Sequence, residues 1–286
     1  MLKQRIITAL ILLAILLPAL FASTPTPFVA LSLVLIAAAA WEWSRLVGWG
    51  GAPALASGAL CALICAMLWW AGALDQSMPL LWLAAALVGV PGGAWLIQRG
   101  VPGWPRLPRV IRWVGGISVL CTAWLAMAQA RTIGVNLLLS MLVLVWAADV
   151  FAYFAGRGLG GRFSRVKLAP SISPGKSWEG VWGGMIGVLL VALVWVWVDR
   201  AYALETPSLY TRLYERGGWL LVAGCLFLSA MSVVGDLVES LVKRSAGVKD
   251  SSGLLPGHGG VLDRIDALLP VLPLAMMLVT LGKGTV

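Results

Sequence analysis

Long, nearly uncharged apolar stretches dominate this chain and limit what it can fold into. Nine of them follow one another, at about residues 5–22, 27–44, 55–73, 79–97, 113–130, 136–155, 179–198, 218–241 and 267–282. About 20 apolar residues in a helix cross the roughly 30 Å hydrocarbon core of a bilayer. Because the stretches are continuous and do not alternate with polar residues, a transmembrane β-barrel is excluded. The pattern predicts an all-α, polytopic membrane bundle of about nine transmembrane helices.

The composition agrees with a membrane protein. Hydrophobic residues make up 60% of the 286 residues and charged residues only 12%, whereas a soluble domain carries about 25% charged residues. The net charge of +9 would suit a nucleic-acid partner, but basic residues between spans are typical of membrane proteins, so we expect no nucleic-acid binding. Four cysteines lie inside apolar stretches, where packing in the core explains them: Cys61, Cys65, Cys121 and Cys225.

The distribution of basic residues predicts the orientation in the membrane. With the N-terminus inside, 16 of the 21 Lys and Arg residues fall on the inner side. The other five are Arg131, Arg200, Arg212, Arg216 and Lys283. The positive-inside rule therefore predicts a cytoplasmic N-terminus and an external C-terminus. The first stretch ends in a weak signal-peptidase pattern, but a short turn leads directly into the second stretch, so we expect the first span to be retained.

Among the acidic residues inside predicted spans, where a charge is costly, three stand out. Asp149 falls in the sixth span, and Asp236 and Glu239 fall in the eighth. An acid at a helix centre costs about 2.5–3.5 kcal/mol on insertion scales, so such a group normally faces a cavity or a partner. Helical spacing places four residues on one face, namely Asp236, Glu239, Ser240 and Lys243. This face predicts a binding site at the inner boundary; for Asp149 alone, an ion pair that fixes packing is an equal alternative.

A basic, glycine-rich loop at residues 156–180 joins the sixth and seventh spans. Backbone amides and cations of such a loop suit phosphate oxygens. In the run SPGKSWEG, we expect Ser173 to cap the seventh helix, with Pro174 at its first position and Lys176 beside the free amides. A solvated basic loop would explain the arginines but not this ordered helix start.

A second glycine-rich loop, residues 243–266, carries the only histidine of the sequence, His258. The loop suits an anionic ligand, because it combines cations with glycines that let the backbone approach a ligand closely. The cations are Lys243, Arg244 and Lys249, and the glycines are Gly253, Gly257, Gly259 and Gly260. We expect His258 to hydrogen-bond a phosphate or handle a proton, with a purely loop-structuring role as the alternative.

The acids around the second loop favour a hard divalent cation. Asp263 and Asp266 open the last span and offer oxygen ligands. Mg²⁺ takes one or two protein carboxylates together with substrate phosphates and water. We therefore expect Asp236 and Asp263 to meet across the junction of the last two spans and hold Mg²⁺, and a second cation remains open.

Four motifs carry a resemblance to a known family. The run SLVKRSAGVKDSSGLLPGHGGVLDRID, residues 240–266, resembles the signature of phosphatidate cytidylyltransferases, also called CDP-diacylglycerol synthases. The resemblance continues in WAADVFAY (146–153), SPGKSWEG (173–180) and AAWEWSRL (39–46), so it covers nearly the whole chain. One departure is Ser177, where the family pattern has threonine; the hydroxyl is kept.

The resemblance implies a commonly dimeric membrane enzyme that makes CDP-diacylglycerol and pyrophosphate from CTP and phosphatidic acid with Mg²⁺. By motif, Asp236 and Asp263 match the metal-binding acids. The matching catalytic positions are Lys243, Arg244, Lys249, Asp250, His258, Arg264 and Asp266. The positions expected to bind substrate are Asp149, Ser173, Lys176, Ser177, Glu179, Glu239, Gly259 and Gly260.

Two other functions stay open on the sequence alone. A CTP-dependent lipid-alcohol kinase would transfer the γ-phosphoryl group and release CDP. An ion-coupled transporter would use Asp149, Asp236 and Glu239 as coupling acids, although the chain shows no internal repeat. For the division of the chain, we expect residues 1–130 to form a scaffold with dimer contacts, and residues 131–286 to form the catalytic region within membrane lipid.

Overall fold

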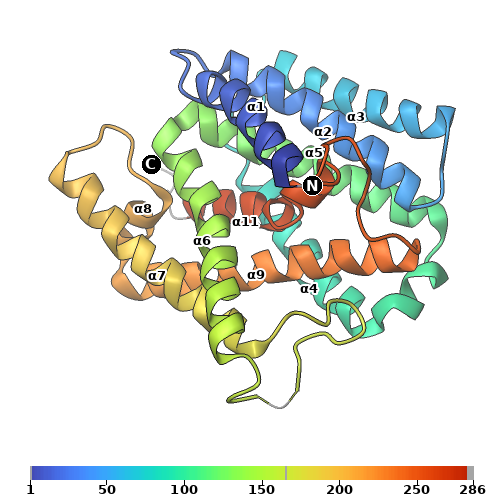
Figure 1. Ribbon diagram of the computed structural model, residues 1–286. Coiled ribbons are helices and arrows are strands. Elements are labelled where there is room, and N and C mark those ends of the chain that lie inside the picture. Colours follow the sequence, from blue (N-terminus) through green and yellow to red (C-terminus); the bar gives the residue numbers. More distant parts are fainter. Residues whose placement is uncertain (1, 165, 282–286) are drawn as a thin grey trace.

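The computed structural model describes residues 2–164 and 166–281, and in these residues the fold is a helical bundle (Figure 1). Eight helices are long and apolar enough to cross a membrane. They are α1 (Leu2–Leu20), α2 (Thr26–Leu46), α3 (Ala52–Trp70), α4 (Pro79–Gly103), α5 (Arg109–Ile133), α6 (Val135–Leu159), α7 (Trp178–Ala201) and α9 (Gly218–Ser245). Short elements complete the bundle: η1 (Trp104–Arg106), α8 (Leu209–Arg216), α10 (Leu262–Ile265) and α11 (Leu268–Thr280). The predicted all-α, multi-pass architecture is confirmed.

The predicted ninth span is the shorter helix α11, at the centre of the bundle. Its 13 residues span about 20 Å at 1.5 Å per residue. α11 packs against α4, α5 and α9, and residues 271–276 are all buried. A helix surrounded by other helices does not need the length of one that faces lipid. Residues 282–286, including Lys283 with its predicted external location, lie outside the described residues.

Contacts between distant segments show which loops lie at which end of the bundle. At one end, Arg5 Nε donates to the Gly257 carbonyl at 2.9 Å, and the Ser245 hydroxyl donates to the Val101 carbonyl at 3.2 Å. At the other end, Arg131 donates to the Leu20 carbonyl at 2.9 Å. The start of α1 therefore lies at the same end of the bundle as the second glycine-rich loop; which end faces the cytoplasm stays a prediction.

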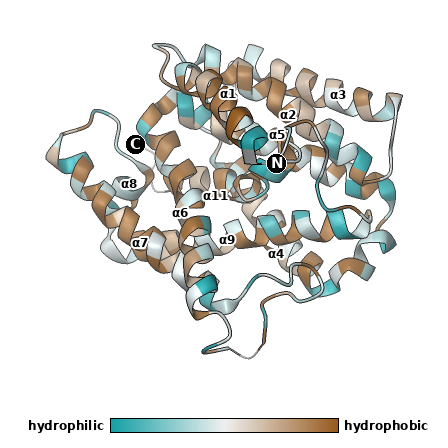
Figure 2. Ribbon diagram, in the orientation of Figure 1, coloured by the Kyte–Doolittle hydropathy of each residue, from teal (hydrophilic) through white to brown (hydrophobic). Residues whose placement is uncertain are grey.

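The outward faces of the long helices are apolar, and hydrophilic residues gather mainly at helix ends and in loops (Figure 2). Leu10 on α1, Leu80 on α4 and Trp197 on α7 are 61%, 80% and 66% exposed. In a bilayer such side chains meet lipid tails, so the hydrophobic effect does not drive the helices together. The helices associate through close packing of their surfaces. Helices α6 and α7 pack closely: a Cβ on Gly184 would lie 2.7 Å from the Ala148 carbonyl oxygen.

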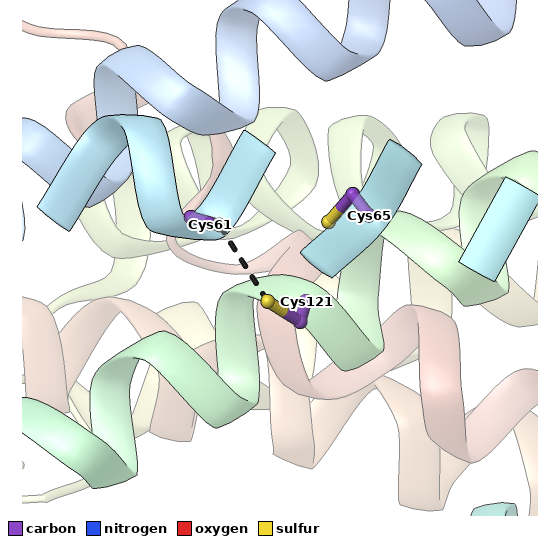
Figure 3. A group of neighbouring side chains, drawn as sticks. All are labelled: Cys61, Cys65 and Cys121. Carbon is purple, nitrogen blue, oxygen red and sulfur yellow. Dashed lines mark hydrogen bonds between the residues drawn. The ribbon is translucent and has the colours of Figure 1, made fainter. Parts of the chain in front are cut away.

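Three of the four cysteines meet where α3 and α5 pack together (Figure 3). Cys61 and Cys65 come from α3 and Cys121 from α5; their sulfur atoms all lie within 4.8 Å of one another. Cys61 Sγ and Cys121 Sγ are 3.6 Å apart. Binding a soft metal here would require thiolates, and burying that charge in an apolar core is costly. The three thiols therefore act as small apolar side chains, as the sequence predicts for core cysteines.

Candidate active site

Two lysines with their acidic partners mark the place where α9 meets the two glycine-rich loops. Lys176, just before α7, lies with its Nζ 2.5 Å from Asp236 Oδ2. Lys243, in the last turn of α9, lies 2.6 Å from Asp263 Oδ1 and also contacts Glu239. Side chains from three separate segments, all predicted to be functional, are thus brought to one end of the bundle.

The polar face of α9 is present as predicted. The Ser240 hydroxyl donates to Asp236 Oδ1 at 3.2 Å, and Lys243 reaches back one turn to Glu239. Glu239 is 4% exposed, so Lys243 balances the charge of a buried carboxylate. The second oxygen, Glu239 Oε1, is buried without a hydrogen-bond partner among the described residues. This oxygen can therefore accept a hydrogen bond or a cation inside the site.

Asp263 organises the second glycine-rich loop. Its Oδ2 accepts hydrogen bonds from the backbone amides of Ser251 at 2.9 Å and Gly260 at 2.7 Å, and from the Ser251 hydroxyl at 2.9 Å. Burial alone would raise the pKa of Asp263, but the hydrogen bonds from Lys243 and from these amides outweigh it and lower the pKa to about 2. The carboxylate is therefore charged at neutral pH.

Asp266 lies between α10 and α11 in a more acidic environment. Burial raises its pKa to about 7, and the negative charges of Asp236 and, more weakly, Asp149 act in the same direction. Asp149 comes from α6, so three elements contribute acids to one region. Such a group of carboxylates requires cations, and Lys176 and Lys243 supply them.

In the first glycine-rich loop, the predicted N-cap at Ser173 is wrong. Helix α7 begins at Trp178, and Ser177 is its N-cap, with its hydroxyl accepting from the Gly180 amide at 3.2 Å. The Lys176 amide donates to the Ser173 carbonyl at 3.2 Å, so residues 173–176 form a turn. Proline followed by glycine favours a turn over a first helical turn. This turn aims Lys176 at Asp236.

Glu179, in the first turn of α7, holds the first loop in place. Its Oε1 accepts from the amides of Phe163 at 3.1 Å and Ser164 at 2.7 Å, and the side chain is buried. Its described contacts are therefore with the loop backbone. The substrate-binding roles of Glu179, Ser173 and Ser177 stay predictions.

The remaining residues of the second loop lie closer to the surface. Arg264 Nη2 donates to the His258 carbonyl at 2.6 Å, which closes the loop on itself. His258 Nδ1 is buried and lacks a hydrogen-bond partner within the described part of the chain. Arg244, Lys249 and Asp250 are exposed, where they can reach a ligand from solution.

Gly259 and Gly260 are required by the loop itself. Gly259 has a φ of +84°, and a Cβ there would lie 2.6 Å from Asp263 Oδ2. A Cβ on Gly260 would lie 2.3 Å from an oxygen of Glu42. Both glycines thus let the backbone approach carboxylates of the protein; contact with substrate stays a prediction.

Glu42 is the site residue that sequence reasoning missed. It lies on α2, is 0% exposed, and accepts hydrogen bonds from two separate parts of the second loop, at Ser252 and Leu262. The available signal was an acid inside an apolar span, which calls for a partner. The motif AAWEWSRL contains it, but nothing in the spacing indicates a partner more than 200 residues away.

A mostly apolar cavity of about 630 Å³ adjoins the acids. α4, α5, α9 and α11 form its walls, and Glu239 and Asp266 lie in its lining. Most other lining residues are apolar or glycine, among them Leu81, Val88 and Ile111. A molecule with a polar head and apolar chains fits this arrangement.

The side chains present fit a hard divalent cation. Carboxylate oxygens are the ligands that Mg²⁺ prefers, and Asp236, Asp263 and Glu239 each lie against a lysine ammonium. Cations therefore already stabilise these carboxylates, and Glu239 Oε1 is left without a hydrogen bond in the described chain.

Comparison with known proteins gives a consistent result. The cytidylyltransferase family matches residues 3–281. A phosphatidate cytidylyltransferase of Pseudomonas aeruginosa is 38% identical over 99% of this chain and 99% of its own length. One of Haemophilus influenzae is 37% identical over 96% of each chain. One of Bacillus subtilis is 42% identical over 49% of this chain and 45% of its own.

Proposed function

This chain belongs to the cytidylyltransferase family. We propose that cytidylyl transfer takes place at the acid–lysine cluster, which consists of Lys176, Asp236, Glu239, Lys243 and Asp263. The enzyme transfers the cytidylyl group of CTP to phosphatidate, giving CDP-diacylglycerol and pyrophosphate. The observation that carries the location is the convergence of Lys176, Asp236, Lys243 and Asp263 at one end of the bundle.

The lipid substrate fits the apolar cavity beside the cluster. Its acyl chains would lie among the side chains of α4 and α5, and its phosphate would reach the polar end at Glu239 and Asp266. The acyl chains come from the bilayer and not from water, so the cavity would hold them by close packing and not by the hydrophobic effect. The lipid phosphate would then lie at headgroup level, next to the loops that receive CTP.

The triphosphate of CTP requires cations and amide donors, and both glycine-rich loops supply them. Lys176 and Lys243 would exchange part of their contact with the carboxylates for phosphate oxygens. Arg244, Lys249 and Arg264 extend the positive charge outward along the second loop. These residues bind and orient the triphosphate so that its α-phosphorus faces the lipid phosphate.

In the reaction, a phosphatidate oxygen forms a new bond to the α-phosphorus of CTP. The bond from that phosphorus to the β-phosphate oxygen breaks, and pyrophosphate leaves with the electron pair. A phosphate oxygen is ionised near neutral pH, so no strong general base is needed. His258 acts as a positioning donor to a phosphate, because its Nδ1 lacks a partner in the described structure.

Asp236 and Asp263 would hold Mg²⁺ together with substrate phosphates, and Glu239 Oε1 offers a further oxygen. When bound, the ion neutralises phosphate charge and stabilises the departing pyrophosphate. Lys243 keeps Asp263 charged and in place for this role. A second cation would be held by the same group of acids.

We further propose that the enzyme is a homodimer in the bacterial inner membrane with its site facing the cytoplasm. The bacterial relatives and the eight long apolar helices support a multi-pass membrane location. CTP is a cytosolic substrate, and most basic residues belong to the loops at the end of the site.

The products of CTP labelled at different phosphates test this function. With purified protein, phosphatidate and Mg²⁺, we expect the α-label to enter the lipid and the γ-label to appear in pyrophosphate. A lipid-alcohol kinase would instead place the γ-label in the lipid and release CDP. Lipid labelling from the γ-phosphate, or none at all, would contradict the proposed reaction.

A further inference from the structure

Glu42 is a carboxylate whose hydrogen-bonding capacity is filled by one loop. Oε1 accepts from the Ser252 hydroxyl at 2.5 Å and the Val261 amide at 3.0 Å. Oε2 accepts from the Leu262 amide at 2.7 Å and lies 3.2 Å from the Ser251 hydroxyl, whose single proton is shared with Asp263 Oδ2 at 2.9 Å. A carboxylate has about four acceptor positions, and here four neutral groups lie against them.

The four donors belong to the two ends of a single segment. Ser251 and Ser252 lie in the loop after α9, which ends at Ser245, and Val261 and Leu262 lie where α10 begins. Glu42 therefore joins the start and the end of residues 251–262 from a helix near the N-terminus. Since α2 is a long helix packed against α3 and α5, it provides a rigid support for the loop.

Glu42 also connects directly to Asp263. The Ser251 hydroxyl lies 3.2 Å from Glu42 Oε2 and 2.9 Å from Asp263 Oδ2. The Gly260 backbone passes between the two carboxylates: its amide donates to Asp263 at 2.7 Å, and a Cβ there would lie 2.3 Å from Glu42 Oε1. A shift of Glu42 would move Ser251 and Gly260, and with them Asp263.

We propose that Glu42 is a positioning residue for cytidylyl transfer. It fixes both ends of the loop 251–262, and thereby places the Asp263 carboxylate and its partner Lys243 against the phosphates. This rests on the reaction and site proposed above. Glu42 itself touches neither substrate, because it is fully buried beneath the loop.

The test compares Glu42→Gln with a matched change at the opposite end of the bundle. In Glu42→Gln, an amide group replaces one oxygen; the serine hydroxyls can turn, but one backbone amide loses its acceptor. Asp199→Asn is the control. Asp199 is 5% exposed and accepts from Asn136, the Ser208 amide and Thr211 at 2.9, 2.9 and 2.6 Å. Both changes remove one acceptor from a buried carboxylate that holds a loop.

At a temperature where both variants are folded, we expect Glu42→Gln to lower kcat about 10- to 100-fold and to raise the Mg²⁺ concentration for half-maximal activity. Asp199→Asn is expected to lower the thermal midpoint similarly but to keep the wild-type Mg²⁺ dependence. If both variants lose stability alike while Glu42→Gln keeps normal kcat and Mg²⁺ dependence, Glu42 is merely structural and the proposal is overturned.

Two further measurements distinguish the role of Glu42 from a folding defect and from a failure of the proposed reaction. If Glu42→Gln does not fold, Ser252→Ala removes a single donor and is expected to act in the same direction with a smaller effect; wild-type kinetics in that variant would count against the proposal. Hydrogen–deuterium exchange of residues 250–262 should increase in Glu42→Gln and stay unchanged in Asp199→Asn. This readout needs no turnover, so a failure of the proposed reaction would not be confused with a failure of the loop anchor.

Discussion

Asp263→Asn is expected to lower the rate of CDP-diacylglycerol formation by at least about 100-fold, which is the usual scale for losing one electrostatic contact in a transition state. Asparagine is neutral, so it would remove the negative charge of a proposed Mg²⁺ ligand, which also holds Lys243 at 2.6 Å. The measurement is turnover of radiolabelled CTP with phosphatidate over a range of Mg²⁺ concentrations. Near wild-type turnover with unchanged metal dependence would show that the proposed metal site is wrong.

Two variants separate this effect from a disturbed loop. Asp263 accepts from the backbone at Ser251 and Gly260, so its replacement also affects folding. Asp236 is held by the Lys176 and Ser240 side chains, and Asp236→Asn should therefore lose activity with less change in stability. Asp75→Asn, at an exposed position in the loop between α3 and α4, is the matched control and should keep full activity.

Lys243→Met is expected to destabilise the protein strongly as well as inactivate it. Lys243 is the shared partner of Glu239 and Asp263, whose side chains are 4% and 5% exposed. Breaking a buried ion pair by removing one partner costs about 3–5 kcal/mol, because the remaining charge is left uncompensated. The measurement is the thermal midpoint in detergent, which should fall by roughly 10 °C at about 2–4 °C per kcal/mol.

A second change should recover much of that stability. In Lys243→Met with Glu239→Gln, one of the two uncompensated carboxylates becomes neutral, so the thermal midpoint should rise above that of the single variant. Activity should stay low, since the cation and a candidate ligand are both missing. Lys249→Met, at an exposed position, should leave the midpoint unchanged; a fall as large as that of Lys243→Met would contradict this account of Lys243.

The succession of helices could be predicted because the hydrophobicity of each segment decides whether it forms a long apolar helix. The nine predicted stretches correspond to the eight long helices and α11. What hydrophobicity could not reveal is that α11 ends up central and short. Its sequence is as apolar as the others, and only packing against α4, α5 and α9 distinguishes a surrounded helix from a lipid-facing one.

The candidate site could be predicted only where its residues are neighbours on one helix. Asp236, Glu239 and Lys243 follow from helical spacing, which is a local property. The pairing of Lys176 with Asp236 and the role of Glu42 depend on contacts between distant segments, which spacing does not encode. The Ser173 prediction failed because a helix cap and a turn share the same residue types, and the hydrogen bond from Gly180 to Ser177 decides between them.

The most direct measurement is Mn²⁺ binding in the presence of CTP. Binding is detected as a loss of the electron paramagnetic resonance signal of the free ion. Mn²⁺ takes the same oxygen ligands as Mg²⁺. The account predicts that the wild-type chain and Asp75→Asn bind Mn²⁺ alike, and that Asp236→Asn and Asp263→Asn each weaken binding at least about 10-fold. Equal Mn²⁺ binding by all four proteins would contradict the claim that these two aspartates hold the metal at which CTP and the lipid phosphate meet.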